Sequence, residues 1–491
     1  MRESGLLVHI TSLAGPERVG TIGRPSRELI DFLSASGTAI WQMLPIGPVG
    51  YGSSPYQSPS TFAGNPLLID IADLKEMGLL STWNESAAAP ESRVDFAAAQ
   101  EQKERALRQS FRESWSSVQQ EAERFAQANP WVLPYARYMA LTGHYGWFDQ
   151  WPLGAKRHAV SPDAETEKVL RSMEEEVHYH LYVQYVFELQ WKRLRKYAAE
   201  KNVQLFGDIP IYVAPGSADV WQHPNLFQVD QNLAPKRVAG VPPDCFSEDG
   251  QLWGNPLYSW LRMWLHGYSW WIDRLKIMKD RFDIIRIDHF IGFANYYSVP
   301  AGASNAKNGK WVKNNGSLFF DRVQKEIPDL NIIAEDLGLI NDRVKKMIAH
   351  CGYPGMKLVM FGLDGDPNNG NRPENIPEHC VAYTGTHDND TVLGWWNLQD
   401  KKTRETVLSI LNLKPGDDIC DGIVRSVLSC KAERAVIPVQ DYLALDNEAR
   451  MNHPGTVGGN NWRYRMRPGD LSDTLLRRMT KLNEEYRRTT I

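Results

Sequence analysis

Three acidic residues at the ends of short apolar runs are the side chains of this chain best placed to do chemistry. Asp288 and Glu335 directly follow runs rich in Ile and Ala, and Asp388 lies a few residues beyond a third. Runs of this kind are typical of strands buried on both faces. A carboxylate at such a strand end must be solvated or paired, because burying it alone costs too much free energy. The three strand ends therefore predict one acidic active site.

Two chemistries use carboxylates in this arrangement, and spacing alone does not separate them. In retaining glycoside transfer, one carboxylate attacks the anomeric carbon and a second, protonated carboxyl protonates the leaving oxygen, the two being about 5–5.5 Å apart. A third acid can then orient a sugar hydroxyl. Alternatively, three acids at successive strand ends can hold Mg²⁺ and stabilise an enolate. Salt bridges without a catalytic role are the third possibility.

Neighbouring residues favour the glycosidic alternative. Arg286 lies two residues before Asp288, so in a strand both side chains point to one face, where a cation keeps a carboxylate ionised. His387, beside Asp388, can hydrogen-bond a hydroxyl. No lysine base follows a strand as the metal alternative needs, and the chain is rich in Trp (17) and Tyr (19). Most of these aromatics are expected to fill the core, but an apolar face with a polar edge also suits sugar rings.

The elements that must position these acids form an α/β pattern. Eight strand-like segments separated by helical sequence predict a (β/α)₈ TIM barrel, in which catalytic groups lie at the C-terminal strand ends. The three acids then belong to strands four, five and seven and face one mouth. The predicted strands are Gly5–Ile10, Ile40–Pro45, Gln204–Ile209, Asp283–Ile287, Asn331–Ala334, Lys357–Phe361, Val381–Thr384 and Ala435–Val439.

The chain is expected to divide into three parts. Residues 1–72 form the first part of the barrel, residues 73–200 a mainly helical insertion, and residues 201–491 the rest of the barrel with active-site loops. The insertion lacks strand patterns, and its residues 92–128 and 164–200 have helical patterns; a separate all-helical domain is the alternative. The Gly- and Pro-rich segment 47–66 is too long for a plain connector and carries Tyr56, so we expect it to be functional.

The composition limits which binding partners and which cellular compartment are expected for the protein. A net charge of -4 gives no basic field for nucleic acid. No run of about 18 apolar residues occurs, so no membrane span is expected, and the N-terminus lacks a signal-peptide pattern. Five cysteines without CxxC spacing predict a reduced, cytoplasmic setting and no zinc site. The segment 364–375 has Asn where a calcium loop needs Gly and Glu, so no metal is expected.

Several longer motifs carry a resemblance to a known family. They are Gly52-Ser-Ser-Pro-Tyr-Gln-Ser58, Gly64-Asn-Pro66, Gly207-Asp-Ile-Pro-Ile-Tyr212, Gly240-Val-Pro-Pro-Asp-Cys-Phe246, Trp253-Gly-Asn-Pro256, Arg286-Ile-Asp-His289, Ala334-Glu-Asp-Leu-Gly338, Gly385-Thr-His-Asp-Asn-Asp390, Arg450-Met-Asn-His-Pro-Gly-Thr456 and Asn461-Trp462. Together they span residues 5–465 and resemble the amylomaltases, the 4-alpha-glucanotransferases of glycoside hydrolase family 77 in the α-amylase clan. Each motif alone is weak, but the set is specific.

The resemblance implies a role for each motif residue. Asp288 would be the nucleophile, Glu335 the acid/base and Asp388 the stabiliser of the transition state. The segment 240–253 would be a loop that overhangs the cleft. The chain departs from the family at 367–377, which is rich in Gly and Asn where relatives carry an aromatic before a proline, and it resembles the short form without an added N-terminal domain. The implied substrate contacts are Tyr56, Asp208, Phe246, Gln251, Trp253, Asn255, Arg286, His387 and Asn461.

The implied activity moves α-1,4-glucan segments between maltooligosaccharides or starch-type glucans through a covalent glycosyl-enzyme, without a cofactor. An α-1,4-glucan hydrolase on the same site is the alternative, because the outcome depends on whether water or a sugar hydroxyl reaches the intermediate first. We expect Tyr56, Phe246 and Trp253 to favour the sugar. A non-enzymatic scaffold that only binds glucan is an alternative of another class.

Overall fold

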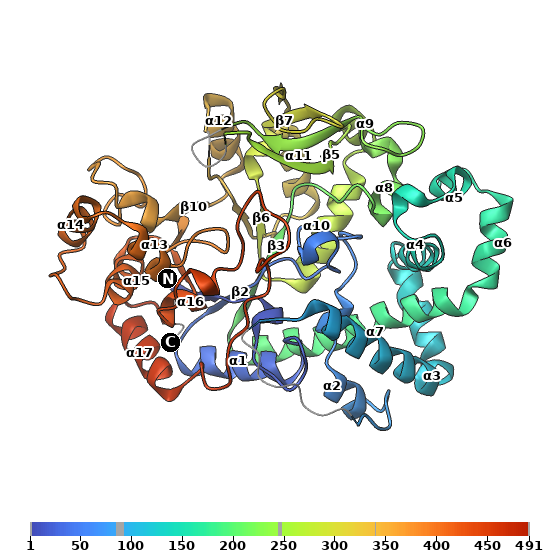
Figure 1. Cartoon of the computed structure of the whole chain (residues 1–491), viewed down its shortest axis with the longest axis horizontal. Coiled ribbons are helices and arrows are strands. Elements are labelled where there is room, and N and C mark those ends of the chain that lie inside the picture. The colour runs from blue at the N-terminus through green and yellow to red at the C-terminus, as the bar shows by residue number, and fades with distance from the viewer. Residues whose placement is uncertain (1, 85–92, 244–247, 339, 490–491) are drawn as a thin grey trace.

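The core of the computed structural model is a barrel of eight parallel strands, which confirms the expected fold class (Figure 1). The structure describes residues 2–84, 93–243, 248–338 and 340–489. In spatial order the strands are β10 (Gly355–Leu358), β11 (Cys380–Tyr383), β12 (Arg434–Pro438), β1 (Glu3–Leu7), β2 (Ile40–Gln42), β3 (Gln204–Ile209), β6 (Ile284–Ile287) and β9 (Ile332–Ala334). The backbone N–H of Ala334 donates to the carbonyl of Pro354, 2.9 Å away, and so links the last strand to the segment before the first.

All eight predicted strands are present, but several are shorter than their apolar runs. The run expected as Ile40–Pro45 leaves the strand after Gln42, and the run expected as Lys357–Phe361 continues after Leu358 as a 3₁₀ turn. Met43 and Leu44 remain fully buried beyond the strand end. Hydrophobicity therefore does not separate a barrel strand from the buried turn that follows it.

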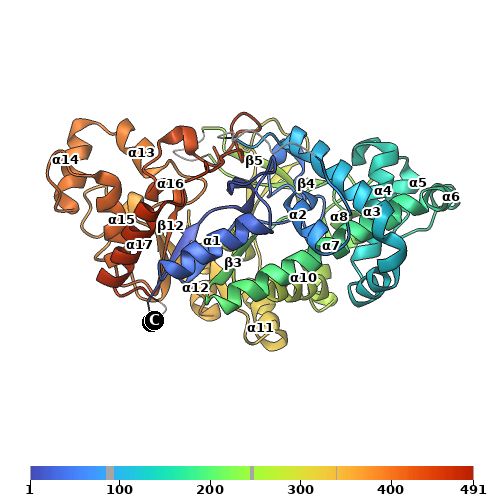
Figure 2. The ribbon, with the colours of Figure 1, turned by 90° about the horizontal axis from the view of Figure 1, so that it is seen from below.

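Helices surround the barrel, as Figures 1 and 2 show. Those that follow or precede its strands are α1 (Arg24–Ala35), α10 (Ser269–Arg281), α11 (Gly316–Glu326), α12 (Asp342–Cys351), α15 (Ile419–Ser429) and α17 (Asp473–Glu485). Asn341, Asp418 and Ser472 cap three of them, since each side-chain oxygen accepts a backbone N–H of the first turn. Shorter or peripheral helices are α2 (Ile71–Glu76), α8 (Ala218–Gln222), α9 (Trp260–Leu265), α13 (Val392–Leu398), α14 (Lys401–Ile410) and α16 (Val439–Tyr442). In the described part of the chain, no helix is long and apolar enough to cross a membrane.

Between β2 and β3 the chain forms a group of helices on one side of the barrel (Figure 1). They are α3 (Phe96–Ala128), α4 (Val132–Tyr145), α5 (Leu153–Arg157), α6 (Ala164–Ser172) and α7 (Glu174–Glu200). The helical stretch expected over 164–200 is two helices, because Met173 leaves helical geometry at φ -115° and ψ 23°. The Gln184 side-chain amide of α7 exchanges two hydrogen bonds with the backbone of Gly64, at 2.8 and 3.0 Å. The insertion therefore holds one end of the 47–66 segment.

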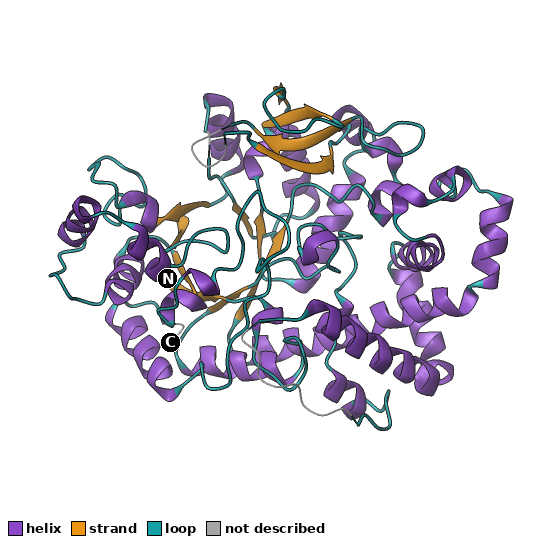
Figure 3. Cartoon of the chain, in the orientation of Figure 1, coloured by secondary structure: helices purple, strands orange, loops and turns teal. Residues whose placement is uncertain are grey.

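A second, antiparallel sheet lies over one side of the barrel and was not predicted (Figure 3). Its strands are β4 (Arg237–Val241), β5 (Gln251–Pro256), β7 (Asn295–Pro300) and β8 (Lys310–Lys313). The segment 240–253, expected to be a loop, thus begins and ends in paired strands, with Gly240 opposite Leu252. The strands escaped prediction because Leu252 and Trp311 are exposed and Gly and Pro interrupt the alternation.

Candidate active site

The barrel brings the ends of β6 and β9 together, and with them Asp288 and Glu335. Backbone hydrogen bonds continue one residue past the strands, from Asp288 N–H to the Ile209 carbonyl (2.9 Å) and from Glu335 N–H to the Ile287 carbonyl (3.1 Å). The backbone N–H of His289 then donates to Oε2 of Glu335 at 2.8 Å. The residue after one acid therefore binds the other directly, as neighbouring parallel strands allow.

Arg286 joins two carboxylates on adjacent strands. It lies opposite Asp208 in the β3–β6 pair, and its two terminal nitrogens donate to Asp208 Oδ2 and Asp288 Oδ1, each at 2.7 Å. Burial raises the pKa of Asp208, while Arg286 lowers it. Burial also opposes the charge of Arg286, but the two carboxylates outweigh this and hold its pKa well above the ordinary value. The arginine stays charged and counters both acids.

Glu335 lies in a different environment. Its side chain is buried and accepts backbone hydrogen bonds from His289 and Leu337, at 2.8 and 2.7 Å. Burial raises its pKa to about 8, with Arg286 lowering it and Asp288 raising it. Glu335 is therefore protonated at neutral pH, whereas Asp288, with 28% of its side chain exposed, is paired with a cation. A buried, protonated acid thus lies next to an acid that is paired with an arginine, and their roles as proton donor and nucleophile stay a prediction.

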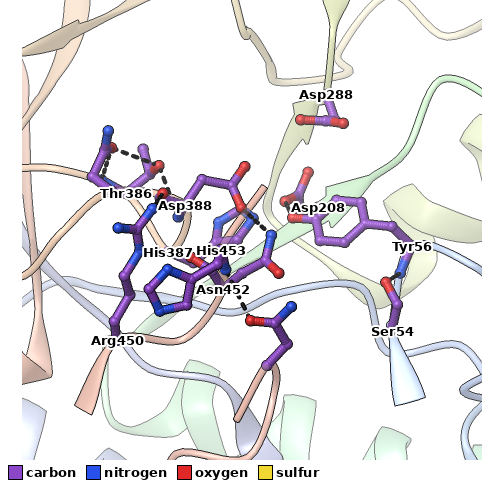
Figure 4. Close-up of polar contacts among 12 residues, drawn as sticks. Ser54, Tyr56, Asp208, Asp288, Thr386, His387, Asp388, Arg450, Asn452 and His453 are labelled. Atoms are coloured by element: carbon purple, nitrogen blue, oxygen red, sulfur yellow. Dashed lines mark hydrogen bonds and ion pairs between the residues drawn. The ribbon is translucent and has the colours of Figure 1, made fainter. Parts of the chain in front are cut away.

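Asp388 is held from a third direction, as Figure 4 shows. The side-chain amide of Asn452 donates to its Oδ1 at 2.7 Å, and Arg450 donates to its backbone carbonyl at 2.6 Å. Nε2 of His387 lies 3.3 Å from the same Oδ1. The Asp388 side chain remains 41% exposed, so it can still reach a ligand. In Figure 4 its carboxylate faces the same space as those of Asp208 and Asp288.

Aromatic side chains line this space. The ring of Tyr56 stacks on His387 with centroids 5.4 Å apart, and its hydroxyl donates to Asp208 at 2.6 Å. Trp253 packs edge-on against His289 at 4.9 Å, and its indole N–H donates to Gln251 at 3.1 Å. The segment 47–66 and the second sheet thus each contribute an aromatic ring that packs against a histidine next to one of the acids.

Two other predicted substrate contacts, Asn255 and Asn461, form hydrogen bonds with other parts of the protein. The side-chain amide of Asn255 is buried and donates to the carbonyl of Val213 at 2.8 Å, with Gln57 donating to its oxygen at 3.2 Å. Asn461 accepts from the backbone of His453 at 2.9 Å and also binds Thr456. Both side chains brace the walls of the site in this structure, and their contact with substrate stays a prediction. The prediction for Phe246 lies outside the described residues.

Three contributors to the site were not assigned from the sequence. His289, Arg450 and Asn452 all lie within motifs quoted above, but their partners depend on folding. Asn452 is 64 residues from the Asp388 carboxylate that it binds. Within the described residues no three His, Cys, Asp or Glu side chains are arranged to hold a metal ion.

Comparison with known proteins gives the family. The sequence pattern of glycoside hydrolase family 77, described as 4-alpha-glucanotransferase, matches residues 8–472. The chain belongs to this family. Among family members, the 4-alpha-glucanotransferase of Thermus thermophilus is 41% identical over 485 residues, covering 96% of each chain. That of Clostridium butyricum is 38% identical, covering 98% of this chain and all of its own.

A solved family 77 structure is similar over the whole length. The amylomaltase from Streptococcus agalactiae, determined in complex with acarbose, matches with a TM-score of 0.96 and 34% identity, covering 100% of both chains. The family 77 fold therefore extends over the barrel, the helical insertion and the second sheet. The recognition made from the motifs is confirmed, as is the (β/α)₈ architecture.

Proposed function

We propose that the protein is a 4-alpha-glucanotransferase that breaks and re-forms α-1,4-glucosidic bonds by a retaining double displacement. One observation carries the mechanism: Asp288 is paired with a buried arginine at 2.7 Å, while Glu335, on the next strand, is buried with its pKa raised to about 8. A nucleophile must be ionised and an acid must be protonated at the same pH. The alternative of a hydrolase on the same site is not favoured, because the relatives named above are described as transferases.

In the first step, Asp288 attacks the anomeric carbon and the glycosidic oxygen leaves with the proton of Glu335. This gives a covalent glycosyl-enzyme and releases the leaving glucan with a new hydroxyl at its 4-position. In the second step, the 4-hydroxyl of an acceptor glucan loses its proton to Glu335 and attacks the same carbon from the opposite side. Asp288 is released, the anomeric configuration is retained, and the two carboxyl groups regain their starting protonation.

The remaining groups are proposed to orient the sugar. Asp388, held by Asn452 and Arg450, faces the site with an exposed carboxylate that can bind ring hydroxyls as positive charge develops on the sugar. His387 lies beside it and is stacked on Tyr56, which fixes the plane of its ring. These contacts become useful only when the substrate approaches the transition state, which is the requirement for raising kcat.

The substrates are proposed to be α-1,4-glucans and maltooligosaccharides as donors, with glucose or maltooligosaccharides as acceptors. The acarbose complex of the Streptococcus agalactiae relative supports this class, because acarbose is the ligand named for that protein. We also propose a reducing, cytosolic setting, supported by four buried cysteines that are free thiols in the described residues. The division into residues 1–72, 73–200 and 201–491 remains part of the same proposal.

The test is to incubate the purified protein with maltotriose in the presence of EDTA and to separate the products by chromatography. A ladder of longer maltooligosaccharides together with glucose is the expected result. Release of glucose and maltose alone would instead mark a hydrolase. No turnover in EDTA that returns with Mg²⁺ would overturn the metal-free mechanism.

A further inference from the structure

Two adjacent residues at the end of the eighth strand, Gln440 and Asp441, support the segments that hold Asp388. They lie in the short helix α16 directly after β12 and are both buried. Within the described residues, the side-chain hydrogen bonds of Gln440 and Asp441 go to residues other than the three acids. Their side chains instead hydrogen-bond the loop that carries Asp388 and the segment that contains Arg450 and Asn452.

Asp441 binds both ends of the loop that carries Asp388. One carboxylate oxygen accepts a hydrogen bond from the hydroxyl of Thr384, which directly follows β11. The other accepts from the backbone N–H of Val392, the first residue of α13, at 2.8 Å. The loop between these points contains His387 and Asp388, so a single buried side chain fixes where the loop leaves the barrel and where it returns.

Gln440 supports the second segment. Its side-chain amide donates to the carbonyl of Ala449 at 3.2 Å. The next residues along the chain, Arg450 and Asn452, are those that bind the backbone and the carboxylate of Asp388. The two segments that meet at Asp388 are thus anchored to the same pair of neighbouring residues.

A small cavity of about 30 Å³ lies beneath the loop, lined by His387, Asp390, Gln440 and Asp441 among others. Backbone hydrogen bonds, such as the one from the N–H of Asn452 to the carbonyl of His387 at 3.1 Å, also hold the loop. Asp441 differs from these contacts because one side chain binds both ends of the loop.

We propose that Asp441, with Gln440, is a positioning residue that sets the place of Asp388 over the sugar site. The proposal rests on the role of Asp388 proposed above. Losing both Asp441 hydrogen bonds lets the loop shift, and misplacement of a catalytic group by about 1 Å can lower turnover on the order of 100-fold. The loss is expected in kcat and not in KM, because Asp388 acts on the transition state.

The experiment compares Asp441→Ala and Asp441→Asn for kcat and KM on maltotriose disproportionation. Alanine removes both hydrogen bonds and is expected to lower kcat about 10- to 100-fold with KM changed less than about threefold. The asparagine side chain can accept a hydrogen bond from the N–H of Val392 and donate one to the hydroxyl of Thr384, which then acts as acceptor instead of donor. In the Asp441→Asn variant, kcat should therefore be within about threefold of the wild-type value. Thr384→Val replaces the hydroxyl with a methyl group and so removes only one of the two hydrogen bonds of Asp441. It should give an intermediate loss of kcat, and it provides the test if the alanine variant does not fold.

Asp70 provides a matched control. It is also buried and also accepts one threonine hydroxyl, from Thr21 at 2.6 Å, and one backbone N–H, from Asp73 at 2.9 Å, but at the start of α2. Asp70→Ala should lower thermal stability to a similar extent and leave kcat near the wild-type value. Equal kcat losses in the two alanine variants would overturn the positioning role, as would a wild-type kcat in Asp441→Ala. If Asp388→Asn itself retains full kcat, the proposed function fails instead.

Discussion

Replacing Glu335 by glutamine tests the central assignment of the site through two independent properties. Glutamine has nearly the same shape but carries no proton to donate, and general acid–base groups contribute about 10²- to 10⁴-fold to rate. Transfer from maltotriose should therefore fall by at least about 100-fold. The second property is stability, because a buried acid kept protonated for catalysis is unfavourable to the fold once the pH permits its ionisation.

The sign and size of the stability effect follow from the shifted pKa. The ordinary pKa of the Glu335 carboxyl is 4.5 and its folded value is about 8. Between these values the folded protein holds one more proton than the unfolded chain, so raising the pH lowers the unfolding free energy by about 1.4 kcal/mol per unit. The contribution of Glu335 to the unfolding free energy is fully present below pH 4.5 and is lost as the pH rises through 8. The total loss is on the order of 5 kcal/mol.

Replacing Glu335 by glutamine removes this dependence of the unfolding free energy on pH, but it also weakens the hydrogen bonding around the side chain. Glu335 accepts from the backbone of both His289 and Leu337, and a glutamine amide has only one oxygen to accept with. Leaving one buried N–H unpaired costs about 1–3 kcal/mol at every pH. The variant is therefore expected to be less stable than the wild type at pH 5 and more stable at pH 8.

Urea unfolding at four pH values from 5 to 8, together with turnover at each pH, measures both properties. Glu28→Gln, whose side chain is 56% exposed, is the control and should keep wild-type turnover. A difference in unfolding free energy that does not change with pH would refute the buried, protonated state of Glu335. Turnover close to that of the wild type in the Glu335→Gln variant would refute its role as acid.

Two further changes test the aromatic wall and the shared cation. Trp253→Ala is expected to lower the ratio of longer maltooligosaccharides to free glucose, because it removes an aromatic face beside the acids; a constant ratio in product analysis would rule this out. Arg286→Met leaves Asp208 buried without its cation, which should lower the unfolding free energy in urea by about 3–5 kcal/mol. Arg24→Met, whose ion pair with Glu28 is exposed, should change it by no more than about 0.5 kcal/mol, and similar losses in both variants would refute the argument.

The barrel was predictable because its strands are buried on both faces. Near-continuous apolar runs such as Ile284–Ile287 and Ile332–Ala334 differ clearly from helical spacing, and each stops at an acid. The second sheet was not predictable on this basis, since β5 and β8 are partly or largely exposed and the buried strands β4 and β7 contain Gly, Asn and Ser in place of a continuous apolar run. The break at Met173 was also hidden, because the apolar stripe continues across it.

The site was predictable where partners are close in sequence. Arg286 and Asp288 share a face because side chains alternate along a strand, and the ion pair at 2.7 Å follows from that spacing. The bond from Arg286 to Asp208 depends on the register of two strands 78 residues apart, which no local pattern encodes. The bond from Asn452 to Asp388 likewise joins two loops whose paths are set by folding.

The different environments of Asp288 and Glu335 follow from where the fold places one cation. Arg286 projects from β6 between that strand and β3, where Asp208 lies opposite it in the pair. Its two terminal nitrogens donate to Asp208 and Asp288, whereas Glu335 on the other neighbouring strand accepts from the backbone N–H groups of His289 and Leu337. Burial then raises the pKa of Glu335, while Asp288 lies in a direct ion pair with Arg286. Asp208 therefore fixes one end of the arginine whose other end pairs with Asp288, the nucleophile proposed above.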